Sequence, residues 1–159
     1  MKLNRILVPL DGSTLAEAAL RKAVDLAAED DATISLLRAA EAYTRLGDPV
    51  DAQVMAVREA EGYLAAVAQR LRRRGCRRIE IHVGYGPAAA VIVEAATAQK
   101  ADLIVMSTHG RSGLRRLILG SVTESVLRGT TIPILIVHPE SGLVNIPVRS
   151  RPAREAAHV

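Results

Sequence analysis

Residues 101–128 read ADLIVMSTHGRSGLRRLILGSVTESVLR, and the order of residue types in this stretch decides the fold. The apolar run at 103–105 has the character of a strand that is buried on both faces. A loop with glycines at 110, 113 and 120 follows it. Ser121 and Glu124 then have the spacing of a capping box, so we expect a helix to begin at 121.

The same alternation of strand and helix extends along most of the chain. Strands are expected at 5–10, 32–39, 78–83, 101–107 and 132–138, and helices at 14–28, 51–74, 86–99 and 121–128. This pattern predicts a parallel sheet covered by helices on both faces. Thr14 and Glu17 have capping-box spacing at the start of the first helix, with Ser13 as the alternative cap. Gly75 is placed to close the long second helix.

Length and composition predict one domain with a core of small aliphatic residues. The chain has 159 residues, no Phe, no Trp and three Tyr. We expect a domain at 1–139 and a flexible C-terminal tail at 140–159, where the alternating pattern is lost. The scarcity of aromatic residues argues against a stacking surface for single-stranded nucleic acid.

The net charge of +4 includes a dense arginine cluster at 70–78. Such a cluster either binds nucleic acid or is the solvated end of a helix, where cations suit the negative pole of the helix dipole. We prefer the second interpretation and do not expect nucleic-acid binding. Cys76 is the single cysteine, and no stretch resembles a signal peptide or a run of ~20 apolar residues. We therefore expect a cytoplasmic protein that does not enter a membrane.

Ligands of open α/β sheets bind beyond the carboxyl ends of the strands. Asp11, Ala39 and the segment 107–110 all follow predicted strands. The expected helix start at Ser121 favours anions such as phosphate, and Gly120 lets a ligand approach the backbone. The chain lacks the G-x-x-x-x-G-K-[ST] and G-x-G-x-x-G motifs, which argues against the common nucleotide-binding loops. Glycines and serines also form ordinary turns and helix caps. From these residues alone, a phosphate-binding loop and an ordinary turn therefore both remain open.

Four stretches of the chain carry a specific family resemblance. ILVPLDGST at 6–14, HVGYGP at 82–87, the quoted 101–128 and PILIVH at 133–138 occur in the order found in the universal stress protein family, which the chain resembles from Lys2 to His138. The resemblance implies a three-layer, adenine-nucleotide alpha-hydrolase-like fold with an open five-stranded parallel sheet of order 3-2-1-4-5. It also implies a homodimer.

The ATP-binding branch of that family carries the motif G-x2-G-x9-G-[ST]. Its positions here are Ser107, Gly110, Gly120 and Ser121, so a serine replaces the first glycine. The resemblance implies that Asp11 faces adenine and ribose, and that the phosphates lie at Gly110 and at 120–122. The nucleotide-binding residues it implies are Pro9, Asp11, Ala39, Met106, Ser107, His109, Gly110, Arg111, Gly120, Ser121, Val122 and Thr123.

Catalysis is not expected beyond slow ATP hydrolysis. The four histidines do not have metal-ligand spacing. His109 could donate to a phosphate or act as a weak base, but a loop histidine more often only hydrogen-bonds the backbone. Mg²⁺ or Mn²⁺ would accompany ATP through phosphate oxygens and water.

We expect a stress-response regulatory protein that binds ATP or another adenine nucleotide. Ser107 favours the alternative, a nucleotide-free dimeric interaction module of the same family. An arginine-mediated nucleic-acid binder ranks third. The apolar edge strand expected at Ile132–His138 predicts a homodimer, because pairing with a symmetry mate would cover that edge.

Overall fold

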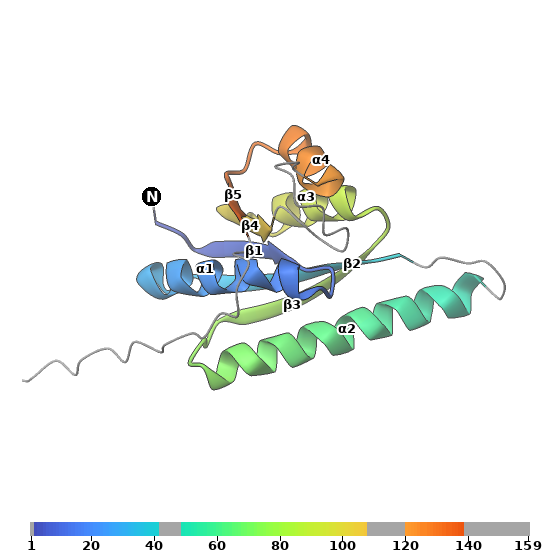
Figure 1. Ribbon diagram of the computed structural model, residues 1–159, viewed down its shortest axis with the longest axis horizontal. Helices are drawn as coiled ribbons and strands as arrows, with labels where there is room; N and C mark the ends of the chain where they lie inside the picture. The colour runs from blue at the N-terminus through green and yellow to red at the C-terminus, as the bar shows by residue number, and fades with distance from the viewer. Residues whose placement is uncertain (1, 42–48, 108–119, 139–159) are drawn as a thin grey trace, which may run out of the picture.

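The computed structural model describes residues 2–41, 49–107 and 120–138, and these form a three-layer α/β domain (Figure 1). The elements in chain order are β1 (Arg5–Pro9), α1 (Thr14–Asp30), β2 (Thr33–Ala40), α2 (Pro49–Arg73), β3 (Ile79–Tyr85), α3 (Ala88–Ala98), β4 (Leu103–Ser107), α4 (Ser121–Gly129) and β5 (Ile134–Val137). The strands form one parallel sheet with the order β3-β2-β1-β4-β5. Helices α1 and α2 cover one face of the sheet, and α3 and α4 cover the other (Figure 1). The predicted architecture and strand order are confirmed.

Strand β1 lies at the centre of the sheet, and its three middle residues are completely buried. Ile6, Leu7 and Val8 each have 0% exposure. Ile6 and Val8 belong to the core beneath α1 and α2, and Leu7 belongs to the core beneath α3 and α4. Pro9 ends the strand, as its missing N–H predicts. Because successive side chains of a strand point to opposite faces of the sheet, β1 contributes to the core on both faces.

Strand β5 is shorter than the sequence pattern predicts. The Ile132 amide donates to the Thr130 hydroxyl over 3.1 Å, so Ile132 belongs to the turn that enters the strand. Pro133 follows and has no N–H to donate, although its carbonyl accepts from the Ile104 amide over 2.9 Å. The regular strand therefore begins only at Ile134.

The predicted capping box at the start of α1 is wrong, and the alternative cap is correct. Ser13 is the N-cap, and its Oγ accepts from the Ala16 amide over 3.1 Å. The Glu17 carboxylate does not reach back to the cap. It accepts instead from the Tyr63 hydroxyl at 2.9 Å and from the Arg70 guanidinium at 2.8 Å. These partners on α2 fix α2 against the first turn of α1.

The arginine cluster lies at and beyond the C-terminal end of α2, which supports its interpretation as a helix end. Gly75 has a φ of +94° and closes the helix as predicted. Besides Arg70, two other members contact neighbouring groups: Arg72 donates to the Ile79 carbonyl, and Arg78 pairs with Asp31 at 3.0 Å. Within the part of the chain that the structure describes, no helix is both long and apolar enough to cross a bilayer.

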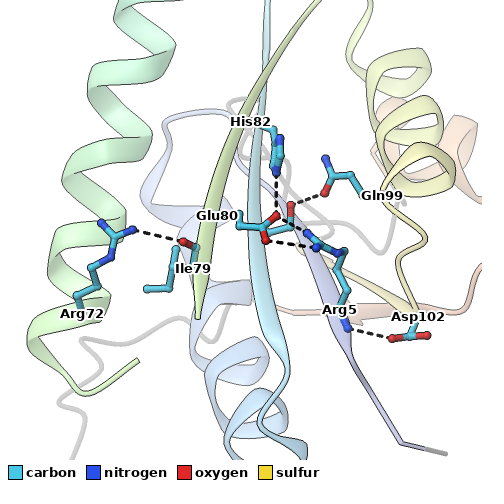
Figure 2. A network of polar contacts seen from close by, with 8 residues as sticks. Arg5, Arg72, Ile79, Glu80, His82, Gln99 and Asp102 are labelled. Carbon is cyan, nitrogen blue, oxygen red and sulfur yellow. Dashed lines mark hydrogen bonds and ion pairs between the residues drawn. The ribbon is translucent and has the colours of Figure 1, made fainter. Parts of the chain in front are cut away.

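A network of polar side chains links strands near their amino ends, away from the carboxyl ends of the sheet (Figure 2). Arg5 on β1 pairs with Glu80 on β3, which also lies 3.4 Å from the His82 ring nitrogen. The Arg5 hydrogen bond lowers the pKa of Glu80. Asp102 accepts from the backbone amides of Asn4 at 2.7 Å and Arg5 at 2.9 Å, and these bonds lower the pKa of its carboxyl group.

Two glycines provide opposite tests of packing. A Cβ on Gly84 would lie 2.4 Å from Cγ1 of Val91, so α3 packs directly on the backbone of β3. A Cβ on Gly62, within α2, would have nothing within 4 Å. We expect Gly84→Ala to lower the free energy of unfolding by about 1–3 kcal/mol through overpacking. The matched control, Gly62→Ala, should raise it by about 0.5–1 kcal/mol through helix propensity. Urea unfolding measures both, and a neutral Gly84→Ala would contradict the close α3 contact.

The lowered pKa of Asp102 predicts a pH-dependent contribution to stability. Its hydrogen bonds stabilise the ionised form, so the contribution is complete above about pH 4 and is lost as pH falls through the folded-state pKa. We expect Asp102→Asn to cost about 1 kcal/mol at pH 7, and the difference from wild type to shrink toward pH 2.5. The exposed Asp25→Asn is the control. Urea midpoints between pH 7 and 2.5 check this, and a pH-independent difference would contradict it.

Candidate functional site

The carboxyl ends of β1, β2 and β4 meet at one edge of the sheet, where α4 also begins. Nine residues of the predicted site lie along this edge: Pro9, Asp11, Ala39, Met106, Ser107, Gly120, Ser121, Val122 and Thr123. The other three, His109, Gly110 and Arg111, lie outside the described residues. The strands and α4 thus gather segments that are more than 100 positions apart in the sequence.

The turn after β1 holds the Asp11 carboxylate in a defined place. Its Oδ1 accepts from the Ser13 amide at 2.9 Å and from the Ser13 hydroxyl at 2.6 Å. Between them Gly12 has a φ of +86°, a conformation that favours glycine. Oδ2 makes no hydrogen bond or ion pair with the residues that the structure describes. Asp11 can therefore hold the turn with one oxygen and offer the other to a hydroxyl or amino group of a ligand.

Among the residues that the structure describes, no side chain caps the first turn of α4. Gly120 is the N-cap, and its carbonyl accepts from the Glu124 amide over 3.0 Å. The predicted capping box of Ser121 and Glu124 is therefore wrong. Ser121 already lies inside the helix, and the Glu124 carboxylate pairs with Arg128 at 2.7 Å. Amide groups at an uncapped helix start, together with the helix dipole, favour an anion.

One buried contact connects α4 to the end of β4. The Thr123 hydroxyl donates to the Ser107 carbonyl over 3.5 Å, and the two residues are 3% and 9% exposed. The contact places the start of α4 beside the carboxyl end of β4, whose neighbour in the sheet is β1. Ser121 and Val122 are exposed at this start.

Three other predicted residues contribute mainly through their backbone or by packing. Met106 is 5% exposed and lies in the core beneath α3 and α4, so a ligand would meet its main chain. Pro9 is half-buried at the end of β1. Ala39 is half-buried on β2, opposite Gly84 of β3.

The edge carries opposite charges at its two ends. Asp11 contributes a carboxylate beside β1, and the α4 N-terminus contributes partial positive charge beside β4.

Two surface pockets formed by the described residues lie away from this edge of the sheet. One, of about 540 Å³, lies between α2 and β3, and the other, of about 490 Å³, lies near the C-terminal ends of α3 and α4. No group of three or more His, Cys, Asp or Glu side chains within the described ranges could hold a metal ion.

The sequence interpretation missed Arg38, a single arginine in the apolar run TISLLRAA of β2. Its side chain is 13% exposed, and its guanidinium group faces Gly12, the residue after Asp11. A lone cation in a strand that is otherwise buried was the signal that could have identified it.

Residues 2–138 match the model of the Universal stress protein family. The chain belongs to this family. A universal stress protein of Methanocaldococcus jannaschii is 33% identical over 139 residues, which cover 84% of this chain and 81% of the relative.

Solved structures of universal stress proteins share the fold. One, in complex with cAMP, is 26% identical, covers 87% of this chain and 99% of its own, and superposes with a TM-score of 0.69. An Arabidopsis thaliana universal stress protein with AMP bound has a TM-score of 0.63 at 15% identity, with coverage of 87% and 93%. At that identity the second likeness concerns the fold alone.

Proposed function

We propose that this universal stress protein is a regulatory protein that binds ATP at the carboxyl edge formed by β1, β2, β4 and the start of α4. The observation that carries the proposal is the Thr123–Ser107 contact, which holds an uncapped helix start on the edge that also bears Asp11. An adenylate has a hydroxyl-rich nucleoside at one end and phosphates at the other. Its two ends match the two ends of this edge.

Electrostatics sets the orientation of the nucleotide. A carboxylate suits ribose hydroxyls or the adenine amino group and repels phosphate, so Asp11 would face the nucleoside. The amide groups of Ser121 and Val122 would face the phosphates, because the helix dipole favours anions there. Mg²⁺ or Mn²⁺ would come with the phosphates and keep water as most of its ligands.

The relatives support an adenine nucleotide as the class of ligand. The solved universal stress protein that is 26% identical to this chain contains cAMP, which consists of adenosine and one phosphate, and ATP also contains both. The further phosphates of ATP are supported here by the motif positions Gly110, Gly120 and Ser121. We propose ATP on this ground.

We propose a binding role rather than efficient turnover. Efficient hydrolysis needs a base positioned beside the attacking water. In the described part of the edge, the Asp11 carboxylate is engaged by Ser13, and its charge places it at the nucleoside end. We propose at most slow hydrolysis of ATP. We also propose that the protein acts in the cytoplasm.

A second candidate is a nucleotide-free interaction module of the same family. It is favoured by Ser107, which replaces the first motif glycine and is 9% exposed. The two candidates differ in one measurable property, the affinity of the unmodified chain for ATP.

Calorimetric titration with ATP and Mg²⁺ tests the first candidate, together with mass spectrometry of nucleotide that co-purifies. We expect saturable binding, and about tenfold weaker binding by Asp11→Asn, which keeps an acceptor for the Ser13 amide but loses the charge. The exposed Asp25→Asn is the control. Absence of heat and of any thermal shift at millimolar ATP would reject the proposal. Binding that appears only in Ser107→Gly would favour the nucleotide-free module.

We also propose a homodimer through β5, the sheet edge beside β4. All four residues of β5, Ile134–Val137, are only half-buried. The Ile104 amide donates to the Pro133 carbonyl, so the alternate residues Ile134 and Ile136 direct their N–H groups to the free edge. Pairing with the same strand of a second copy would satisfy these groups.

Sedimentation velocity at micromolar concentration tests the dimer. We expect a dimer for the wild type and a monomer for Ile136→Pro, because the proline removes an outward N–H without removing a donor to β4. Ile136→Val is the control and should remain a dimer. A wild-type monomer would refute the proposal, and a dimeric Ile136→Pro with native circular dichroism would place the interface elsewhere.

A further inference from the structure

We propose that Arg38 is a positioning residue for the nucleoside end of the site. Its guanidinium group supports Gly12 and thereby fixes the Asp11 carboxylate. The inference rests on the proposed adenylate site, and it adds a residue whose side chain lies behind the turn and not among the expected ligand contacts.

The first observation is the position of Arg38 relative to Gly12. A Cβ added to Gly12 would lie 3.4, 3.5 and 3.5 Å from Nη1, Cζ and Nη2 of Arg38, which is ordinary van der Waals contact. A point in the guanidinium plane beyond its two terminal nitrogens would be clearly nearer to these nitrogens than to Cζ. The nearly equal distances therefore place Gly12 over the face of the group. The flat guanidinium faces the turn at Gly12 across a gap that a Cβ would fill.

The second observation is that Arg38 is itself held from several directions. Its side chain is 13% exposed, and Cζ lies 5.0 Å from the centre of the Tyr63 ring, a cation–π distance. Nη2 pairs with Glu59 at 3.1 Å. Glu59 is 72% exposed, so this ion pair alone would hold the arginine weakly. Burial against Tyr63 and Gly12 supplies the rest.

The contacts close into a ring that returns to Asp11. Tyr63 donates its hydroxyl to Glu17, in the first turn of α1. Burial, and then this hydrogen bond, raise the pKa of Tyr63, which keeps the hydroxyl protonated as a donor. The N-cap of α1 is Ser13, which Asp11 holds through its amide and hydroxyl. Arg38 thus supports from one side the turn that α1 holds from the other.

A planar group is essential to this role. Lysine would keep the charge and could keep the Glu59 ion pair, but its ammonium cannot present a flat face to Gly12. Arg38→Lys and Arg38→Met should therefore both loosen the turn. Arg70→Met is the matched control, because Arg70 belongs to the same ring of contacts through Glu17, whereas the side-chain atoms nearest to Gly12 are those of Arg38.

The experiment measures binding of AMP, ATP and inorganic tripolyphosphate to the full chain and to the three variants. We expect Arg38→Met to weaken AMP and ATP by about tenfold, since a carboxylate must be held within fractions of an ångström to bond a hydroxyl. Arg38→Lys should weaken them at least threefold. Tripolyphosphate, which would meet only the α4 end, should bind all variants equally. Arg70→Met should change no affinity, even where its melting temperature falls.

Three results would overturn the inference. Equal weakening of tripolyphosphate by Arg38→Met would indicate a direct charge effect, full rescue by lysine would exclude the planar contact, and unchanged AMP affinity would exclude the role altogether. If the wild type binds neither AMP nor ATP, the proposed function fails as well. A readout without ligand separates these cases: the backbone amide resonances of Gly12 and Ser13 should shift in Arg38→Met and not in Arg70→Met.

Discussion

The parallel pairing of β1 with a neighbour on each side is the constraint on which the site depends. Three consecutive residues of β1, at positions 6–8, are fully buried, and the strand pairs with β2 on one side and β4 on the other. All three strands therefore end at one edge. The chain leaves β1 toward α1 on one face, whereas the helix that follows β4 lies on the other face (Figure 1). A reversal of strand order of this kind is where ligands of α/β sheets typically bind.

Periodicity and apolar runs predicted every described helix and strand, because burial on two faces or on one leaves a direct mark in the sequence. The exact helix starts were harder to predict. The spacing of a capping box occurs at both α1 and α4, yet neither glutamate closes one. Glu17 is taken by Tyr63 and Arg70, and Glu124 by Arg128. A glutamate's choice between its own helix start and another side chain is a tertiary matter, which spacing does not encode.

In the candidate site, too, some features could be predicted from sequence patterns, whereas others depend on tertiary contacts. Asp11 and the start of α4 could be predicted, since each follows or begins an element whose place in the sheet is set by topology. The role that we propose for Arg38 could not be predicted, because its nearness to Gly12 and Tyr63 depends on the packing of α2 against β2. The strand order itself came from the family resemblance, since alternation predicts a parallel sheet without ordering its strands.

Charge also explains why the two ends of the proposed site would hold different parts of a nucleotide. Coulomb repulsion between a carboxylate and a phosphate is strongest at short separation. Asp11 then acts on the groups that touch it, and the dipole of α4 acts on the anionic end. A ligand bound in reverse would bring its phosphates to Asp11 and its sugar hydroxyls to the helix start, losing both interactions.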